Sequence, residues 1–179
     1  MHVLYDLNGN YFSLTSALFP EGISYVNKVM IIFVDHNYCS DNPWKDAYEY
    51  CSKFIDCKNT VIFMTAAKNY IFKKTDYGKI IISAGIGESA ENAGKTINIG
   101  VFLDEGVNIN GLIDLIRTVT EAKSGALMDL SMKITGTVSD AVAVGAKVGN
   151  ISFLGPGTPL GKKIALEIRE TLKFLLRKD

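Results

Sequence analysis

The chain has 179 residues, of which 47% are apolar and 21% charged, and 19 basic residues balance 19 acidic ones. This length is typical of one domain, and the apolar share excludes a disordered protein. Zero net charge argues against a protein that binds nucleic acid by neutralising phosphates. We therefore expect a single domain over residues 1–179 with no nucleic-acid partner.

Cysteine and histidine usage restricts the chemistry further. Cys39, Cys51 and Cys57 form no C-x-x-C pair, and with two histidines this disfavours a zinc site. An odd cysteine count without a recognisable secretion signal indicates reduced thiols in the cytoplasm. The longest apolar run, residues 29–34, is far shorter than the roughly 18 residues of a membrane span. We expect a cytoplasmic protein with no bound metal and no membrane partner.

Short apolar runs rich in β-branched residues predict the strands of a sheet. In chain order these runs are residues 29–34, 60–64, 79–83, 97–103 and 141–144. The first seventeen residues and Tyr70 to Lys74 are expected to add edge strands. Several strands follow one another without an intervening helix, which predicts a mixed sheet.

Three segments with helical periodicity predict helices that pack on this sheet. Each follows a residue that can cap a helix N-terminus: Asn42, then Asn108 or Asn110, then Thr158. Proline occupies the first helical position at 43 and at 159. The predicted fold class is α/β (or α+β), a single domain with a mixed β-sheet packed by about three helices.

Asp35-His36-Asn37-Tyr38 directly follows the most apolar predicted strand. Loops after strands often bind ligands, and His36 could act as a general acid or base near neutral pH. An exposed loop histidine is the alternative, and the sequence alone favours it.

Gly85-Ile86-Gly87-Glu88, with Gly94 further on, also follows a predicted strand. The spacing does not match a dinucleotide-binding fingerprint. The segment is better interpreted as a flexible loop whose glycines allow close backbone approach.

Thr120-Glu121-Ala122-Lys123 lies in the second predicted helix. Lys123 comes four residues after Val119 and should lie along the buried face. Glu121 is roughly 160° of helix rotation from Lys123, so the two cannot share one small contact on a regular helix. A snorkelling Lys123 and a surface pair of Arg117 with Glu121 are the alternative. Gly125 would allow close approach of another group.

Thr135-Gly136-Thr137-Val138-Ser139-Asp140 places three hydroxyls and a carboxylate before the run at 141–144. Strand alternation would put Thr135, Thr137 and Ser139 on one face, where hydroxyls can hold amide groups. A turn with local side-chain-to-backbone bonds is the alternative.

Gly155-Pro156-Gly157-Thr158-Pro159 opens the last predicted helix. Its free N–H groups would favour an anion or a polarised oxygen, although the segment lacks P-loop spacing. A plain N-cap by Thr158 explains the segment almost as well.

Taken in order, several of these segments resemble motifs of the adenosylcobinamide amidohydrolase family of cobamide salvage. The closest are Thr96-Ile97-Asn98, Thr120 to Lys123, and Thr135 to Val144. Three N-terminal segments and one C-terminal segment are also similar to family motifs: Leu14-Thr15-Ser16-Ala17, His36-Asn37-Tyr38, Met64-Thr65-Ala66-Ala67 and Gly157-Thr158. The resemblance covers nearly the whole chain.

The resemblance implies hydrolysis of the amide that joins aminopropanol to the corrinoid in adenosylcobinamide, which releases adenosylcobyric acid. The corrinoid is then the substrate and small-molecule partner, no cofactor is implied, and a homo-oligomer is compatible with this function. A pocket rich in Asn, Ser and Thr suits a ligand with many neutral amides, because these need partners when desolvated.

Amide hydrolysis needs a base, an oxyanion stabiliser and an acid for the leaving amine. The catalytic candidates are Glu121 as base for water, Lys123 or Thr137 for the oxyanion, and His36 as acid. A Thr137 or Ser139 nucleophile is also open. The candidate substrate-binding residues are Asn37, Thr65, Asn98, Thr135, Gly136, Ser139, Asp140, Gly157 and Thr158.

Two other classes of function are compatible with the sequence. One is a corrinoid-binding protein without catalytic activity. The other is an unrelated hydrolase or transferase that acts on a small carboxylate or phosphate at the Thr158 helix end.

Overall fold

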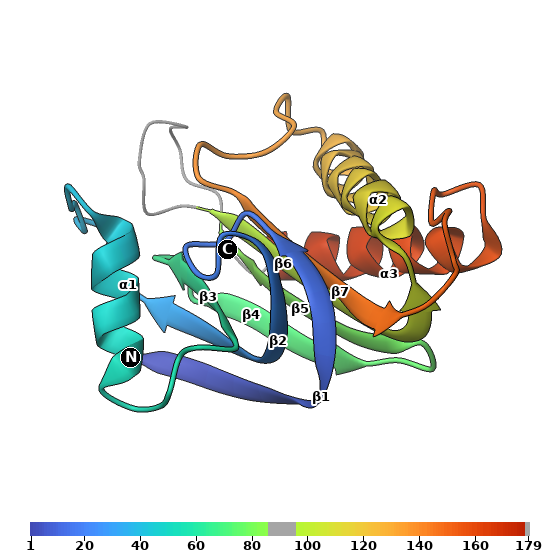
Figure 1. The fold of residues 1–179 in the computed structure, drawn as a ribbon. Coiled ribbons are helices and arrows are strands. Elements are labelled where there is room, and N and C mark those ends of the chain that lie inside the picture. Colours follow the sequence, from blue (N-terminus) through green and yellow to red (C-terminus); the bar gives the residue numbers. More distant parts are fainter. Residues whose placement is uncertain (86–95, 178–179) are drawn as a thin grey trace.

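The structure is a computed structural model that describes residues 1–85 and 96–177. Within these ranges seven strands form one sheet, in the order β3-β2-β1-β7-β6-β5-β4, and three helices pack on it (Figure 1). The strands are β1 (His2–Thr15), β2 (Gly22–Phe33), β3 (Thr60–Thr65), β4 (Asn69–Lys74), β5 (Gly78–Ala84), β6 (Ile97–Val107) and β7 (Ala141–Val148). The helices are α1 (Pro43–Ser52), α2 (Ile109–Asp129) and α3 (Pro159–Leu176).

The sheet is mixed, as predicted. β2 and β3 are parallel neighbours joined through α1, and β6 and β7 are parallel neighbours joined through α2. All other neighbouring pairs are antiparallel. Two strand–helix–strand units therefore flank β1, which is antiparallel to one strand of each unit.

The prediction of an N-terminal edge strand is wrong. β1 pairs with β2 along its length and with β7 from Phe12 to Thr15, so it lies inside the sheet. From Tyr11 to Thr15 it is at least partly buried on both faces, which suits an interior position. Residues 69–74 do form an edge strand, as expected, and β3 forms the other edge.

The sheet is strongly coiled, so that strands far apart in its order meet across the concave face. Tyr5 of β1 stacks on Phe72 of β4 with ring centroids 4.7 Å apart, and Phe33 of β2 packs on Tyr70 at 5.4 Å. The concave interior is filled by buried side chains from six strands, including Leu7, Val29, Phe63, Ile81, Phe102 and Ala143. The right-handed twist of strands favours such coiling.

A polar cluster near the C-terminal part of β6 joins the buried residues Tyr11 and Lys79 to Asp104, whose side chain is 53% exposed. Lys79 Nζ donates to Asp104 at 2.8 and 3.1 Å and to the Tyr11 hydroxyl at 2.5 Å. Tyr11 in turn donates to Asp104 Oδ1 at 2.5 Å. Burial opposes the charge of Lys79, but the bonds to Asp104 and Tyr11 outweigh it and raise the pKa of Lys79.

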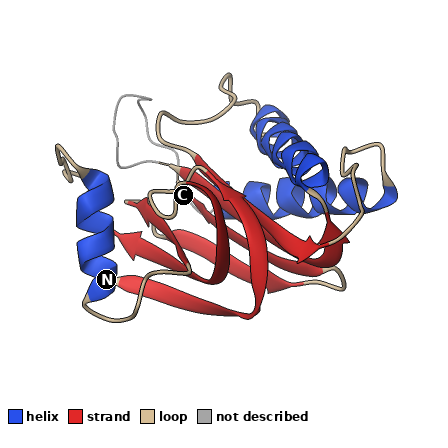
Figure 2. Ribbon diagram, in the orientation of Figure 1, coloured by secondary structure: helices blue, strands red, loops and turns tan. Residues whose placement is uncertain are grey.

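All three helices cover the outer, convex face of the coiled sheet, with α1 well apart from α2 and α3 (Figure 2). α2 and α3 pack together on β5, β6 and β7, and α1 packs on β2 and β3. Alternation along each strand separates the helix-covered face from the interior. Ile80 and Ile82 join the layer under α2 and α3, whereas Ile81 faces the interior. None of the helices in the described ranges combines the length and the apolarity that a membrane crossing requires.

The three predicted caps are confirmed. Asn42, Asn108 and Thr158 each accept a backbone N–H from the first turn of their helix at 3.0 Å. The side chain therefore satisfies one of the unpaired N–H groups that every helix start exposes.

The expectation that all three cysteines are reduced thiols is wrong. Cys51, at the end of α1, forms a disulfide with Cys57, six residues later, and the two Cα atoms are 6.1 Å apart. The chain turns back toward β3 directly after the helix, which brings the two residues together. Cys39 is free and exposed.

Candidate active site

A cavity of about 460 Å³ opens at one end of the coiled sheet. The end of β3, the starts of β6 and β7, the start of α1 and the segment after β1 contribute to its wall. Phe63 also lines it, so the cavity is continuous with the concave interior. Its volume is in the range of about 300–1,000 Å³ that encloses small-molecule ligands.

Polar groups converge on this cavity from five segments of the chain: Ser16, Tyr38, Cys39, Ser40, Thr65, Asn98, Ser139 and Asp140. Among the described residues that line it, Asp140 carries the only charged side chain. Four of the predicted substrate-binding residues are in this lining, namely Thr65, Asn98, Ser139 and Asp140.

Asp140 accepts hydrogen bonds from four donors. Its Oδ1 receives the backbone N–H of Ile97 at 2.9 Å and the hydroxyl of Thr137 at 2.6 Å. Its Oδ2 receives the backbone N–H of Thr137 at 3.0 Å and Lys123 Nζ at 2.5 Å. The carboxylate thus ties together the start of β6, the loop before β7 and helix α2.

The ion pair of Lys123 and Asp140 is almost completely buried, with side chains 10% and 11% exposed. Lys123 lies on the buried face of α2, as predicted, and the alternative of a snorkelling lysine is wrong. Gly136 permits this arrangement, because a Cβ atom there would overlap the Asp140 carboxylate and lie 2.6 Å from Lys123 Nζ.

Residues 135–140 form a loop with a turn rather than a strand. The expectation that Thr135, Thr137 and Ser139 share a strand face is therefore wrong. Local side-chain bonds decide this conformation, because Asp140 holds both the N–H and the hydroxyl of Thr137. Thr135 is exposed and outside the cavity lining, whereas Ser139 remains in it.

Asn98 and Thr65 are the most deeply buried polar residues of the cavity wall, each 2% exposed. Asn98 Nδ2 donates to Ser83 Oγ at 3.1 Å. An amide nitrogen carries two hydrogens, and among the described residues only Ser83 accepts one of them. Next to it, Thr96 Oγ1 donates to the carbonyl oxygen of Ser139 at 2.7 Å, which fixes the loop over the start of β6.

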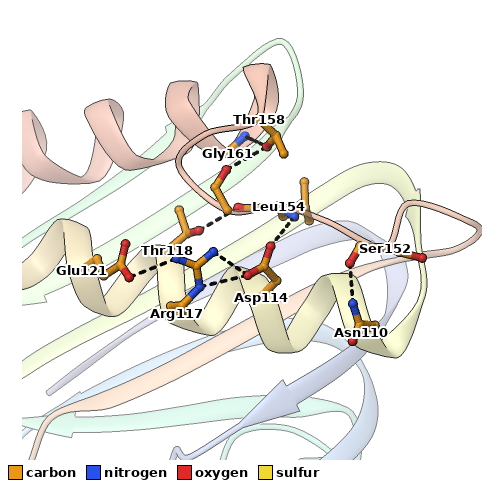
Figure 3. Close-up of polar contacts among 10 residues, drawn as sticks. Asn110, Asp114, Arg117, Thr118, Glu121, Ser152, Leu154, Thr158 and Gly161 are labelled. Carbon is orange, nitrogen blue, oxygen red and sulfur yellow. Dashed lines mark hydrogen bonds and ion pairs between the residues drawn. The ribbon is translucent and has the colours of Figure 1, made fainter.

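Glu121 lies on a different surface, shown in Figure 3. It accepts a hydrogen bond from Arg117 at 3.1 Å, its side chain is 52% exposed, and it is not in the cavity lining. Arg117 also bonds Asp114, which accepts the N–H of Leu154 at 2.8 Å. The Arg117 bond, followed by that N–H, lowers the pKa of Asp114. The predicted surface pair of Arg117 and Glu121 is thus confirmed.

The start of α3 is held against this same network (Figure 3). Thr158 Oγ1 accepts the N–H of Gly161 at 3.0 Å and donates to the carbonyl of Gly155 at 2.9 Å. Gly157 is exposed, and neither Gly157 nor Thr158 lines the cavity. The simpler prediction of a plain N-cap is confirmed for Thr158.

The loop between β2 and α1 contributes Tyr38, from the segment that the sequence singled out, and Cys39 and Ser40, which sequence reasoning missed. His36 and Asn37 are exposed and outside the lining, whereas Tyr38 and the following two residues line the cavity. Tyr38 donates its hydroxyl to Asp46 in α1 at 2.8 Å. Burial, and then this bond, raise the pKa of Tyr38. Trp44 in the first turn of α1 was also missed as a wall residue.

The remaining predictions concern glycines and metals. Gly125 admits the guanidinium of Arg169, whose Nη1 would lie 3.0 Å from a Cβ there. The predicted Gly85–Gly94 loop falls almost entirely outside the described residues. Among the residues described, no group of three or more His, Cys, Asp or Glu is placed to hold a metal ion.

Comparison with known proteins places the chain in one family. The family model described as adenosylcobinamide amidohydrolase matches residues 2–178. Neither the curated proteins nor the solved structures include a match to the chain.

Proposed function

Because the chain belongs to the adenosylcobinamide amidohydrolase family, we propose that it hydrolyses the amide between aminopropanol and the corrinoid of adenosylcobinamide. The carbon–nitrogen bond breaks, a water oxygen completes the new carboxyl group, and the amine takes up a proton. The products are adenosylcobyric acid and aminopropanol, so that the corrinoid is substrate rather than cofactor.

The observation that carries this proposal is the position of Asn98 at the buried wall of a cavity lined by hydroxyl groups. A substrate amide loses its water partners when it enters such a cavity and needs hydrogen bonds in their place. Neutral side-chain donors and acceptors supply these bonds without the desolvation cost of a charge. A carboxamide-bearing ligand therefore fits this lining.

We assign Asn98 as the donor to the carbonyl oxygen of the scissile amide. Ser83 uses one hydrogen of Nδ2 and fixes the side chain, so the second hydrogen is held ready for the substrate. A preorganised donor of this kind stabilises the negative charge that develops on the carbonyl oxygen in the transition state.

We assign Asp140 a positioning role rather than that of a base. Its two oxygens already accept four hydrogen bonds, and a carboxylate has about four lone-pair sites. Taking a proton from water would require breaking one of them. With Lys123 and Thr137, Asp140 instead holds the 135–140 loop and the start of β6, which carry Ser139 and Asn98 into the cavity.

Glu121 and His36 receive no step in this proposal. Glu121 is engaged by Arg117 outside the cavity lining, and His36 is exposed in the loop before α1. The α3 N-terminus is capped by Thr158, which lies outside the cavity lining, and we assign no step to it.

The test is incubation of the protein with adenosylcobinamide in water enriched in oxygen-18. We expect mass spectrometry to detect aminopropanol and adenosylcobyric acid with one labelled oxygen in its new carboxyl group. Binding of adenosylcobinamide without any product would contradict the proposal and support a corrinoid-binding protein without catalysis.

Variants of Asn98 test its role. Asn98→Ala should lower kcat by about 10²- to 10³-fold, as removal of an oxyanion donor does elsewhere. Asn98→Asp keeps the shape of the side chain but places a negative charge next to the oxyanion. Its kcat should therefore be no higher than that of Asn98→Ala. Asn110→Ala, which removes an exposed amide bonded to the Ser152 carbonyl, is the matched control and should keep normal kcat.

A further inference from the structure

We propose that the corrin macrocycle of the substrate rests on an apolar rim formed by Leu18, Trp44 and Val138, while one side arm enters the cavity. This inference depends on the proposed function and specifies how the same site recognises its substrate.

The size of the cavity is the first argument. Its volume of about 460 Å³ suits a drug-sized molecule. A corrinoid, with its macrocycle, amide side chains and adenosyl group, is several times larger. The cavity can therefore enclose the arm that carries the scissile amide, and the macrocycle must stay at the mouth.

The second argument is the exposure of the rim. Trp44 is 50% exposed and Val138 64% exposed, although both line the cavity, and Leu18 in the same lining is partly buried. They come from three separate segments, the first turn of α1, the loop before β7 and the segment after β1. Large apolar side chains gathered at a cavity mouth are typical of binding surfaces.

The third argument is chemical complementarity. A corrin macrocycle carries methyl groups as well as neutral amide arms, so its surface presents apolar patches next to amides. The rim pairs apolar side chains with the hydroxyl-bearing residues Ser16 and Ser40 of the same lining. Indole gives a large, rigid contact area for a flat ligand at a low entropy cost.

In this arrangement the rim residues contribute to substrate affinity and the residues inside the cavity contribute to the chemical step. The rim contacts the macrocycle equally in the ground state and in the transition state, so its loss should raise KM and leave kcat nearly unchanged. Trp44→Ala is expected to raise KM for adenosylcobinamide by about tenfold or more, the effect of truncating an aromatic anchor. Trp44→Phe should recover most of this loss.

Phe153→Ala is the matched control, because Phe153 is an aromatic residue with 69% exposure that is outside the cavity lining. It should leave KM unchanged. A small amide made from propionic acid and aminopropanol is the second control. It lacks the macrocycle, so any cleavage of it should be equal in wild type and Trp44→Ala.

A direct readout comes from Trp44 itself, the single tryptophan of the chain. Adenosylcobinamide should protect it from oxidative labelling, measured by mass spectrometry, and the short amide should not. If the wild type turns over adenosylcobinamide but Trp44→Ala has an unchanged KM, or Trp44 is not protected, the proposal of a rim that binds the macrocycle is overturned. The proposed function is then unaffected. Failure of the wild type both to bind and to cleave adenosylcobinamide overturns the proposed function and the rim with it.

Discussion

Lys123 of α2 and Asp140 of the loop before β7 form a buried ion pair, with Nζ and Oδ2 2.5 Å apart. The two residues are 17 positions apart in sequence, and the pair connects a helix of the outer layer to the wall of the cavity. The backbone N–H groups of Ile97 and Thr137 and the hydroxyl of Thr137 donate the other three hydrogen bonds to the carboxylate. The pair therefore fixes the geometry of the candidate active site from the side of α2.

Removing one partner of this pair should destabilise the folded protein strongly. Lys123→Met leaves the Asp140 carboxylate buried without its cation, and the free energy of unfolding should fall by about 3 kcal/mol. Urea unfolding of the variant measures this. Lys45→Met, which breaks a pair with Glu49 whose side chains are 64% and 62% exposed, should cost less than about 0.5 kcal/mol. Equal losses in the two variants would contradict a structural role for Lys123.

Gly136→Ala should loosen the same pair without removing either charge. The added methyl group would overlap the Asp140 carboxylate and crowd Lys123 Nζ, so the loop must shift. We expect a loss of about 1–3 kcal/mol in unfolding free energy, as for other overpacked sites, with a parallel loss of turnover. Gly157→Ala is the control for stability, since no atom beyond its chain neighbours lies within 4 Å of the place that the added methyl group would take. Wild-type stability of Gly136→Ala would show that the loop is not tightly packed.

The local elements of this fold could be predicted from the sequence because each is encoded by neighbouring residues. Apolar β-branched runs mark buried strands, and the caps at Asn42, Asn108 and Thr158 mark helix starts. The interior position of β1 could not be predicted, because it depends on pairing across the fold, such as Phe12 with Ala146.

The candidate site was predictable to a smaller extent. The helical phase showed that Lys123 is buried, but nothing in the local pattern identifies Asp140 as its partner. Hydroxyl residues at every second position from 135 to 139 imitate a strand, and only the bonds of Thr137 to Asp140 reveal a turn. Cys39, Ser40 and Trp44 were missed, since spacing does not show that the start of α1 meets the starts of β6 and β7.

Glu121→Gln should leave kcat and KM within about twofold of the wild type. The substitution removes one exposed ion pair with Arg117, which keeps its bond to Asp114, and surface pairs of this kind contribute little. Steady-state kinetics with adenosylcobinamide measure the effect. A loss of about 10³-fold or more in kcat would instead support a catalytic base at this position and would contradict our placement of the chemistry.

Asp129 should make stability depend on pH in the acid range. Hydrogen bonds from Arg169, followed by Lys173, lower the pKa of this carboxyl in the folded protein and join α2 to α3. An unfolded Asp has a pKa of about 3.9. Because the folded pKa is lower, the stabilisation is fully present above about pH 4 and is lost as the pH falls through the folded value. Asp129→Asn should thus be less stable than the wild type near neutral pH, with a difference that shrinks in acid. Urea unfolding across this range measures it, and a difference independent of pH would contradict the assignment.

The disulfide between Cys51 and Cys57 should stabilise the protein modestly, because it closes a loop with a sequence separation of only 6 residues. Loop-closure entropy for so short a loop corresponds to about 2 kcal/mol. In a Cys39→Ser background, dithiothreitol should lower the free energy of unfolding by this amount. The further replacement of Cys51 and Cys57 by Ala should abolish the response, since no bond remains to be reduced. Thiol titration of the denatured wild-type chain gives an independent measurement. It should detect Cys39 alone, and reaction of all three cysteines in protein purified without reductant would contradict the bond.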